Sequence, residues 1–199
     1  LKSDYLEAYI NLGDTFKEQG RFKAAGDCYL KAVELQPDCP EVYASMAFCL
    51  QNLGRLDHAI AGYNKAIQLR PDYSEAYNSL GTVYRESGRL GQALACFKKA
   101  AAVKPQDSEA YNNMGIIYKE WGQFEEAISN YQKALQLNPE FTEAYCNLGN
   151  AYGKCGKLAG AIESYRKAIQ HQPDHAYAYN LLVRQLQQTC AWDELQMPV

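Results

Sequence analysis

The sequence lacks the features that mark several common classes of protein. No apolar run approaches the roughly 18 residues that span a bilayer, and the first residues form no signal-peptide pattern. The net charge is −3, so the basic excess typical of nucleic-acid-binding proteins is missing. The 7 cysteines form no C-x-x-C motif, and an odd, scattered set is typical of reduced thiols. These absences predict a cytoplasmic protein without a nucleic-acid or membrane partner.

Sequence signatures of catalysis are missing as well. His58, His171 and His175 have neither metal-ligand spacing nor carboxylates arranged with them, and we interpret them as surface residues. No G-x-x-x-x-G-K-[ST] phosphate-binding loop occurs. The sequence therefore predicts a chain with no catalytic site, no metal site and no cofactor.

What the sequence does contain is a repeat of 34 residues. Proline recurs at this spacing, at Pro37, Pro71, Pro105, Pro139 and Pro173. The spacing predicts five units, at residues 6–39, 40–73, 74–107, 108–141 and 142–175. We expect the tail of an earlier unit at residues 1–5, and a partial sixth unit, or a capping helix and junction, at residues 176–199. Below, the places within each unit are numbered from its first residue.

Small and aromatic residues recur at fixed places of the unit. Place 4 is Tyr, place 8 is Gly except for Ala47, place 20 is Ala, and place 24 is Tyr except for Phe97. Glycine at place 15 separates two helical stretches, and proline ends the second because it lacks an amide donor. Ser74, Ser108 and Thr142 are predicted N-cap residues. Each unit is therefore predicted to be a hairpin of two helices.

The spacing of these residues also predicts how the hairpins pack. An advance of about 100° per residue puts places 4, 7, 8 and 11 of the first helix on one face. Glycine at place 8 and alanine on the partner helix let the two backbones approach closely. A single hairpin cannot bury every apolar residue, so places 3 and 10, which are small or apolar, are predicted to be covered by stacked neighbours.

This pattern resembles the tetratricopeptide repeat (TPR) family over nearly the whole chain. The resemblance implies an all-α fold, a right-handed superhelical solenoid of antiparallel helix hairpins. It also implies that extended protein or peptide segments bind in a concave groove, lined by places 2, 5, 6, 9, 12 and 13 of the first helices. The candidate groove residues are Asn11, Asp14, Ser45, Phe48, Asn78, Ser79, Thr82, Arg85, Asn112, Asn113, Ile116, Lys119, Asn147, Asn150 and Lys154.

Place 6 reads Asn, Ser, Ser, Asn and Asn along the five units. Because asparagine is a mediocre helix former, its recurrence on the inner stripe indicates amides that grip a peptide backbone. The alternative is a solvated polar face that keeps asparagine through shared repeat ancestry. The cationic clamp by which some TPR proteins hold a C-terminal carboxylate is not expected, because place 5 holds Ile10, Ala44, Asn78, Asn112 and Cys146.

Both ends of the chain keep apolar faces that resemble repeat interfaces. Leu1 to Tyr5 resembles the end of an earlier unit, and the last helical stretch keeps the partner-facing stripe of Tyr179, Leu182, Val183 and Leu186. A terminating helix normally turns polar there. We therefore expect a fragment of a longer protein, and we expect its exposed ends to promote end-to-end self-association.

The segment from Leu186 to Glu194 leaves the repeat pattern. Together with Ala144 to Gly149 and the place-6 asparagines, it resembles O-linked N-acetylglucosamine transferases, in which the last repeat leads into the catalytic region. Ser45 and Ser79 depart from that pattern, and the sequence holds no glycosyltransferase region. The resemblance implies a domain that recruits protein substrates for such an enzyme. The alternative is a free-standing TPR adaptor or assembly scaffold with no attached enzyme.

Overall fold

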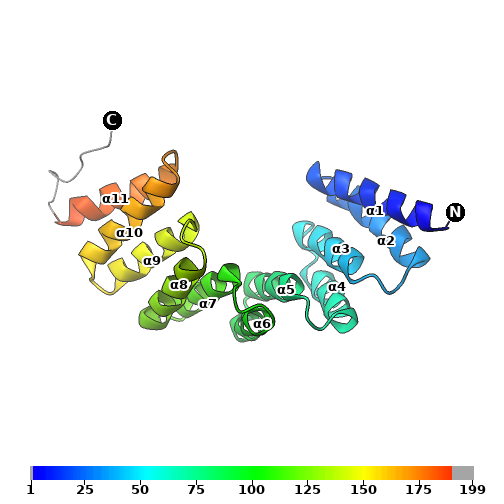
Figure 1. Cartoon of the computed structure of the whole chain (residues 1–199), viewed down its shortest axis with the longest axis horizontal. Helices are drawn as coiled ribbons and strands as arrows, with labels where there is room; N and C mark the ends of the chain where they lie inside the picture. The colour runs from blue at the N-terminus through cyan, green and yellow to red at the C-terminus, as the bar shows by residue number, and fades with distance from the viewer. Residues whose placement is uncertain (1, 190–199) are drawn as a thin grey trace. The chain divides into compact units, whose positions relative to one another are not determined.

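A computed structural model describes residues 2–189 of the chain and the side chains of residues 5–187. Every element in this part is an α-helix, which confirms the predicted array of successive helix hairpins (Figure 1). The helices are α1 (Lys2–Glu18), α2 (Phe22–Leu35), α3 (Pro40–Asn52), α4 (Leu56–Leu69), α5 (Ser74–Glu86), α6 (Leu90–Val103), α7 (Ser108–Glu120), α8 (Phe124–Leu137), α9 (Thr142–Lys154), α10 (Leu158–His171) and α11 (Ala176–Thr189).

Residue contacts divide the chain into two compact units, Leu1–Pro105 and Gln106–Val199, which we call unit 1 and unit 2. In unit 1, α1 pairs with α2, α3 with α4 and α5 with α6, while α2 packs on α3 and α4 on α5. In unit 2, α7 pairs with α8 and α9 with α10, while α8 packs on α9 and α10 on α11. Each unit is therefore a stack of neighbouring hairpins.

Both ends of the described part of the chain are helical. Residues 2–5 continue α1, and α11 begins where the sixth unit was expected. Leu1 and residues 190–199, which include the stretch after Thr189 that resembles a glycosyltransferase junction, lie outside the described residues. Among residues 2–189, no helix combines the length and the apolar character that crossing a bilayer requires.

Glycine at place 15 ends each first helix by a defined turn. Gly88 has a φ of 74°, a left-handed conformation that residues with a side chain rarely adopt. Its amide donates to the carbonyl of Arg85, and the amide of Arg89 donates to the carbonyl of Tyr84, which forms a Schellman motif. Because all five place-15 glycines have φ between 70° and 75°, each repeat reverses its chain in the same way.

The starts of three first helices differ from the prediction by one residue. The predicted N-caps are instead the first helical residues, namely Ser74, Ser108 and Thr142. Before Ser108, the side chain of Asp107 caps α7 by accepting a hydrogen bond from the amide of Ala110 at 3.2 Å. The hydroxyl of Ser74 lies within 3.4 Å of the carbonyl oxygen of Ala100, to which it donates. Ser74 therefore links α5 to the last turn of α6.

Close packing within a hairpin depends on the glycine at place 8. A Cβ added to Gly149 would lie 2.5 Å from a ring carbon of Tyr165, so no side chain fits there without displacing the ring. The second repeat holds Ala47 at this place, and it holds Gly62 at place 23 of the partner helix. A Cβ added to Gly62 would lie 2.9 Å from the Cβ of Ala47. The second repeat thus moves its glycine from one helix to the other.

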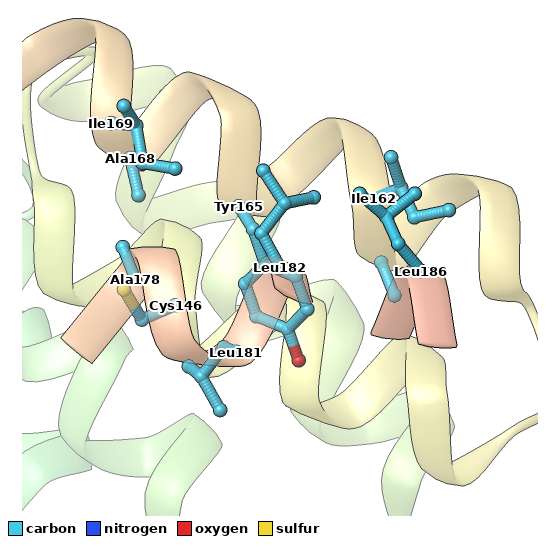
Figure 2. Packing of buried hydrophobic residues seen from close by; sticks show 10 residues of the cluster. Cys146, Ile162, Tyr165, Ala168, Ile169, Ala178, Leu181, Leu182 and Leu186 are labelled. Carbon is cyan, nitrogen blue, oxygen red and sulfur yellow. The ribbon is translucent and has the colours of Figure 1, made fainter. Parts of the chain in front are cut away.

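The predicted repeat interfaces are buried. Places 3 and 10 are at most 2% exposed in the second to fifth repeats, at Val42, Cys49, Ala76, Val83, Ala110, Ile117, Ala144 and Ala151. The corresponding residues of the first repeat, Ala8 and Thr15, are exposed. At the other end, Leu182 and Leu186 of α11 are buried in a cluster with Tyr165 of α10 (Figure 2). Stacking against neighbours therefore supplies much of the apolar burial.

Candidate functional site

We use "inner face" for the surface formed by places 2, 5, 6, 9, 12 and 13 of the first helix of each repeat. Most predicted groove residues are exposed or half-buried on this face, namely Asn11, Asp14, Ser45, Phe48, Ser79, Thr82, Arg85, Asn113, Lys119, Asn147, Asn150 and Lys154. Asn78, Asn112 and Ile116 are buried, with exposed fractions of 6%, 2% and 7%. The side chains of these three residues are therefore packed inside the protein and are not presented to solvent.

The asparagine stripe is partly used within the chain itself. The side-chain amide of Asn147, at place 6, donates to the Oδ1 atom of Asn112, at place 5 of the preceding repeat, at 3.2 Å. One donor of the expected peptide-gripping set therefore links α9 to α7. Asn113 remains half-buried on the face. Replacing Asn112 would also remove an internal hydrogen bond, so Asn113 gives the cleaner test of peptide binding.

Unit 1 has an inner hollow of about 260 Å³, which we call hollow 1. Its lining residues are Lys17, Ala44, Ser45, Phe48, Tyr63, Tyr73, Glu75, Ala76 and Ser79. Phe48 is 42% exposed and meets Phe22 edge to face, with ring centroids 6.1 Å apart. Hollow 1 therefore offers an apolar contact beside the hydroxyl groups of Ser45 and Ser79.

The charges at hollow 1 are paired within the chain. The Nζ of Lys17 lies 2.6 Å from a carboxylate oxygen of Asp14, which also accepts a hydrogen bond from the Tyr29 hydroxyl at 2.8 Å. The hydrogen bonds from Lys17 and Tyr29 outweigh the opposing effect of burial, so the pKa of Asp14 is lowered. Glu75 lies 3.4 Å from the Nζ of Lys104. Hollow 1 therefore presents little net charge to a ligand.

Unit 2 has an inner hollow of about 630 Å³, which we call hollow 2. Its lining residues are Lys119, Phe124, Asn150, Gly153, Lys154, Tyr165, Tyr177, Arg184 and Gln185. Three of these side chains are cationic and none is acidic. Tyr177 is 56% exposed. Hollow 2 therefore combines positive charge with aromatic surface.

Hydrogen bonding orients the polar wall of hollow 2. The hydroxyl of Tyr165 donates to the Oδ1 of Asn150 at 3.1 Å. Burial raises the pKa of Tyr165 to about 12, although the nearby Arg184 acts in the opposite direction. Tyr165 therefore stays protonated at neutral pH and remains a hydrogen-bond donor. A Cβ added to Gly153 would lie 3.2 Å from the Oε1 of Gln185, so Gly153 leaves room for that side chain.

The two hollows occupy equivalent positions of the repeat. Each of four residues of hollow 1 has its counterpart three repeats later in hollow 2, and these pairs are Lys17 and Lys119, Phe48 and Asn150, Tyr63 and Tyr165, and Glu75 and Tyr177. Three of the predicted groove residues, Ser45, Phe48 and Ser79, line hollow 1. Three others, Lys119, Asn150 and Lys154, line hollow 2. Their role in binding stays a prediction.

Several residues of the hollows were missed from the sequence. Arg184 stands at place 9 of the partial sixth repeat, and Lys17 stands at place 12 of the first. Extending the inner-face places to every repeat would have found both. Tyr63 and Tyr165, at place 24, belong to the second helices, and their pattern indicates packing alone. Their hydroxyl groups reach the inner face only because the rings cross the hairpin.

The histidines do not gather into a catalytic or metal-binding site. His58 and His171 are exposed, and His171 stacks on Tyr145 with ring centroids 5.6 Å apart. His175 is half-buried, and its Nδ1 accepts a hydrogen bond from the amide of Ala178 at 3.1 Å, at the start of α11. Within the described part of the chain, no three His, Cys, Asp or Glu side chains come together as a metal-ion site.

Comparison with known solved structures identifies similar folds. A pilF structure from Pseudomonas aeruginosa has a TM-score of 0.85 at 21% identity, covering 96% of this chain and 87% of that chain. A MamA fragment from Desulfovibrio magneticus RS-1 has a TM-score of 0.74 at 25% identity, covering 86% and 97%. YrrB, described as a TPR protein with an unusual peptide-binding site, has a TM-score of 0.66 at 25% identity, covering 86% and 89%.

Comparison of sequences gives the family. None of the curated proteins matches the chain significantly. Models described as "Tetratricopeptide repeat" match residues 6–39, 38–106, 96–129 and 142–175, and a model described as "TPR repeat" matches residues 117–156. Together these matches run through all five predicted repeats. On the evidence of the hairpins, the turn glycines and these matches, the chain belongs to the tetratricopeptide repeat family.

Proposed function

We propose that this chain is a scaffold that binds extended segments of other proteins along its inner face. The observation that carries the proposal is the pair of open hollows at equivalent repeat positions. Ser79 and Asn150 offer hydroxyl and amide groups that suit a peptide backbone, and Phe48 offers exposed apolar surface. Side chains held on packed helices are already positioned, which lowers the entropic cost of binding.

Two findings from the comparisons support a binding role. YrrB is described as a TPR protein with an unusual peptide-binding site, and its structure is similar to 86% of this chain. Repeat scaffolds of the TPR family are typically not enzymes. A cytoplasmic location stays a prediction that rests on the cysteine pattern.

The comparisons favour an adaptor or assembly scaffold over the substrate-recruiting part of a glycosyltransferase. None of the three similar structures is described as a glycosyltransferase. The glycosyltransferase hypothesis depends on the stretch around Cys190 and Trp192, outside the described residues. Reading the gene past Val199 separates the two hypotheses. A catalytic domain there supports the glycosyltransferase hypothesis, and a stop codon supports the adaptor or scaffold.

The experiment that tests peptide binding is a selection from a displayed library of random linear peptides on the immobilised chain. Titration of the selected peptides against Phe48→Ala should show weaker binding, because the variant removes exposed apolar surface from hollow 1. The matched control is Leu30→Ala, since Leu30 is 52% exposed on α2 and lines neither hollow. Asn113→Ala tests the polar contacts of the inner face in the same titration.

The outcome of this titration decides between the two faces of the molecule. Binding that weakens in Phe48→Ala or Asn113→Ala and persists in Leu30→Ala supports the proposal. A library that yields no binding peptide contradicts it. So does a set of peptides whose affinity falls only in Leu30→Ala, because such peptides would bind the second helices.

A further inference from the structure

Hollow 2 carries a local charge opposite to that of its surroundings. Asp and Glu outnumber Lys and Arg in residues 106–199. Lys119, Lys154 and Arg184 nevertheless line one hollow, and no carboxylate lines it with them. Like charges gathered in this way repel one another, so the arrangement raises the energy of the free protein unless an anion offsets it.

The equivalent positions of unit 1 show how this charge arises. The counterparts of Lys154, Arg184 and Tyr177, three repeats earlier, are Asn52, Thr82 and Glu75. Two neutral residues are thus replaced by cations, and the glutamate of place 2 is replaced by tyrosine. Place 2 is glutamate in all five complete repeats, so Tyr177 marks the one repeat of six in which this carboxylate is missing. All three differences make hollow 2 more positive.

Within the described residues, the cations of hollow 2 also lack ion-pair partners. In hollow 1, Lys17 forms an ion pair with Asp14, three residues before it. The counterpart of Asp14 is Ile116, which is buried and leaves Lys119 without that partner. No carboxylate of the described residues forms an ion pair with Lys119, Lys154 or Arg184. The three charges therefore remain available to a ligand.

Neutral groups at hollow 2 suit an anion carried on a peptide. The Oδ1 of Asn150 accepts the hydrogen bond from Tyr165, so its NH₂ group is the part left to donate to a ligand. Arginine and lysine bind carboxylates by charge-assisted hydrogen bonds, and arginine can do so with two parallel bonds. Phe124 and the exposed ring of Tyr177 flank the cations with apolar surface. A peptide carrying a carboxylate could use both kinds of contact.

We infer that hollow 2 is a carboxylate-binding site for a segment of a partner protein, with Lys119, Lys154 and Arg184 holding the anion. The carboxylate is that of an acidic side chain, because the proposed ligand is an extended segment that runs along the inner face. The inference deepens the proposed function and rests on it, because it names the chemistry that one part of the inner face selects. It differs from the cationic clamp at place 5, since these cations stand at places 9, 12 and 13.

The test uses the full chain and three fluorescent octapeptides in an anisotropy titration. The first alternates Glu and Ser and is amidated at its C-terminus. The second alternates Gln and Ser and is amidated, so it carries no carboxylate. The third has the second sequence with a free C-terminal carboxylate. We expect the first peptide to bind more tightly than the second and the third. Tighter binding of the third would assign hollow 2 to a free C-terminus and would overturn the side-chain source.

The variants exchange residues of hollow 2 for their counterparts in unit 1. Lys154→Asn and Arg184→Thr should each weaken carboxylate-peptide binding by about threefold, and the double variant by about tenfold, as expected for partly exposed ion pairs. The control is Lys133→Gln with Lys157→Gln, which removes the same charge from unit 2 without touching hollow 2. It should change the affinity by less than about twofold, since distant exposed charges are screened.

The outcomes separate this inference from the proposed function. Equal binding of all three peptides overturns the inference, as does equal weakening in the double variant and in the control. If peptides selected from the random library still bind the inner face in that case, the proposed function stands without the carboxylate site. If no peptide of either kind binds, both fail. Circular dichroism of the double variant confirms that its helices are intact, so lost binding reports on the hollow.

Discussion

Hollow 1 and hollow 2 occupy the same places of the same repeat, yet they present different chemistry. Both have a buried tyrosine at their base, Tyr63 in one and Tyr165 in the other. Above this base, hollow 1 places the exposed ring of Phe48 beside charges that are paired within the chain. Hollow 2 places around Asn150 three cations that form no ion pair with a carboxylate of residues 5–187. The comparison separates repeat places whose residue type the fold requires from places whose residue type can vary and so set the choice of ligand.

The physical reason lies in what each side chain contacts. The tyrosine ring fills the space inside a hairpin, where a change in volume costs free energy of unfolding. Exposed inner-face residues such as Phe48 and Lys154 lie in solvent, so exchanging them costs the fold little. Specificity can therefore differ between repeats while the backbone repeats without change.

The largest expected effect is a loss of stability on changing the glycine that packs against the buried tyrosine of hollow 2. Gly149→Ala should lower the free energy of unfolding by about 2 kcal/mol, because the added Cβ would lie 2.5 Å from the ring of Tyr165. Adding Ser164→Gly copies the Ala47–Gly62 pair of the second repeat and should recover part of the loss. Urea unfolding of the two variants measures both. Equal stability of Gly149→Ala and the natural protein would show that the ring moves aside freely.

The next effect transfers the charge of hollow 2 to hollow 1. Asn52→Lys, Glu75→Tyr and Thr82→Arg together should raise the affinity for the amidated Glu-Ser octapeptide about tenfold, since about 1.4 kcal/mol of new ion pairing is expected. The variant without Glu75→Tyr keeps a carboxylate at the site and should gain less. If the triple variant gains no affinity in the anisotropy titration, the three positions are not sufficient to form a carboxylate site.

A smaller effect compares the hydroxyl groups of the two tyrosines. Tyr165→Phe should cost about 1 kcal/mol of unfolding free energy, because the buried hydroxyl donates to Asn150 at 3.1 Å. Tyr63→Phe should cost less, because its bond to Gln51 is longer, at 3.4 Å. Urea unfolding of the two variants gives the comparison. The reverse order of losses would mean that hydrogen-bond length does not set the contribution here.

The last prediction concerns the pKa values of the same two tyrosines, which have the smallest effect on stability at neutral pH. Burial, as the largest cause, raises the pKa of both Tyr63 and Tyr165 from 10.0 to about 12. Because the protonated form is favoured in the folded chain, this stability is fully present below pH 10 and is lost as the pH rises through 12. The ultraviolet absorbance of tyrosinate should therefore show a late phase that shrinks in Tyr63→Phe and in Tyr165→Phe. Unchanged late phases in both variants would contradict these assignments.

Much of the fold followed from the sequence because the repeat restates each packing rule several times. The glycine turns and the buried places 3 and 10 depend on local sequence and on nearest neighbours. The N-caps at Ser74, Ser108 and Thr142 were wrong by one residue, because helix starts depend on competing hydrogen bonds.

The candidate site was predicted less completely. The inner-face places gave six of the residues that line the hollows. They could not show that Asn112 is buried and accepts a hydrogen bond from Asn147, because that contact joins neighbouring repeats. Nor could they show that the three cations of hollow 2 converge, since the side chains come from α7, α9 and α11. Contacts across repeats depend on the angle between hairpins, which no single repeat encodes.

In the second repeat, the glycine stands at place 23 (Gly62) and alanine stands at place 8 (Ala47), the reverse of the usual position of glycine. This arrangement limits which recombinants of the array can fold well. A crossover placed between the two helices of a repeat would join Ala47 to a bulkier residue at place 23, or leave two glycines facing one another. The first product is overfilled, and the second carries a void. Crossovers at the prolines keep both members of the pair together. Inherited or engineered shuffling of these repeats should therefore respect whole hairpins as its unit of exchange.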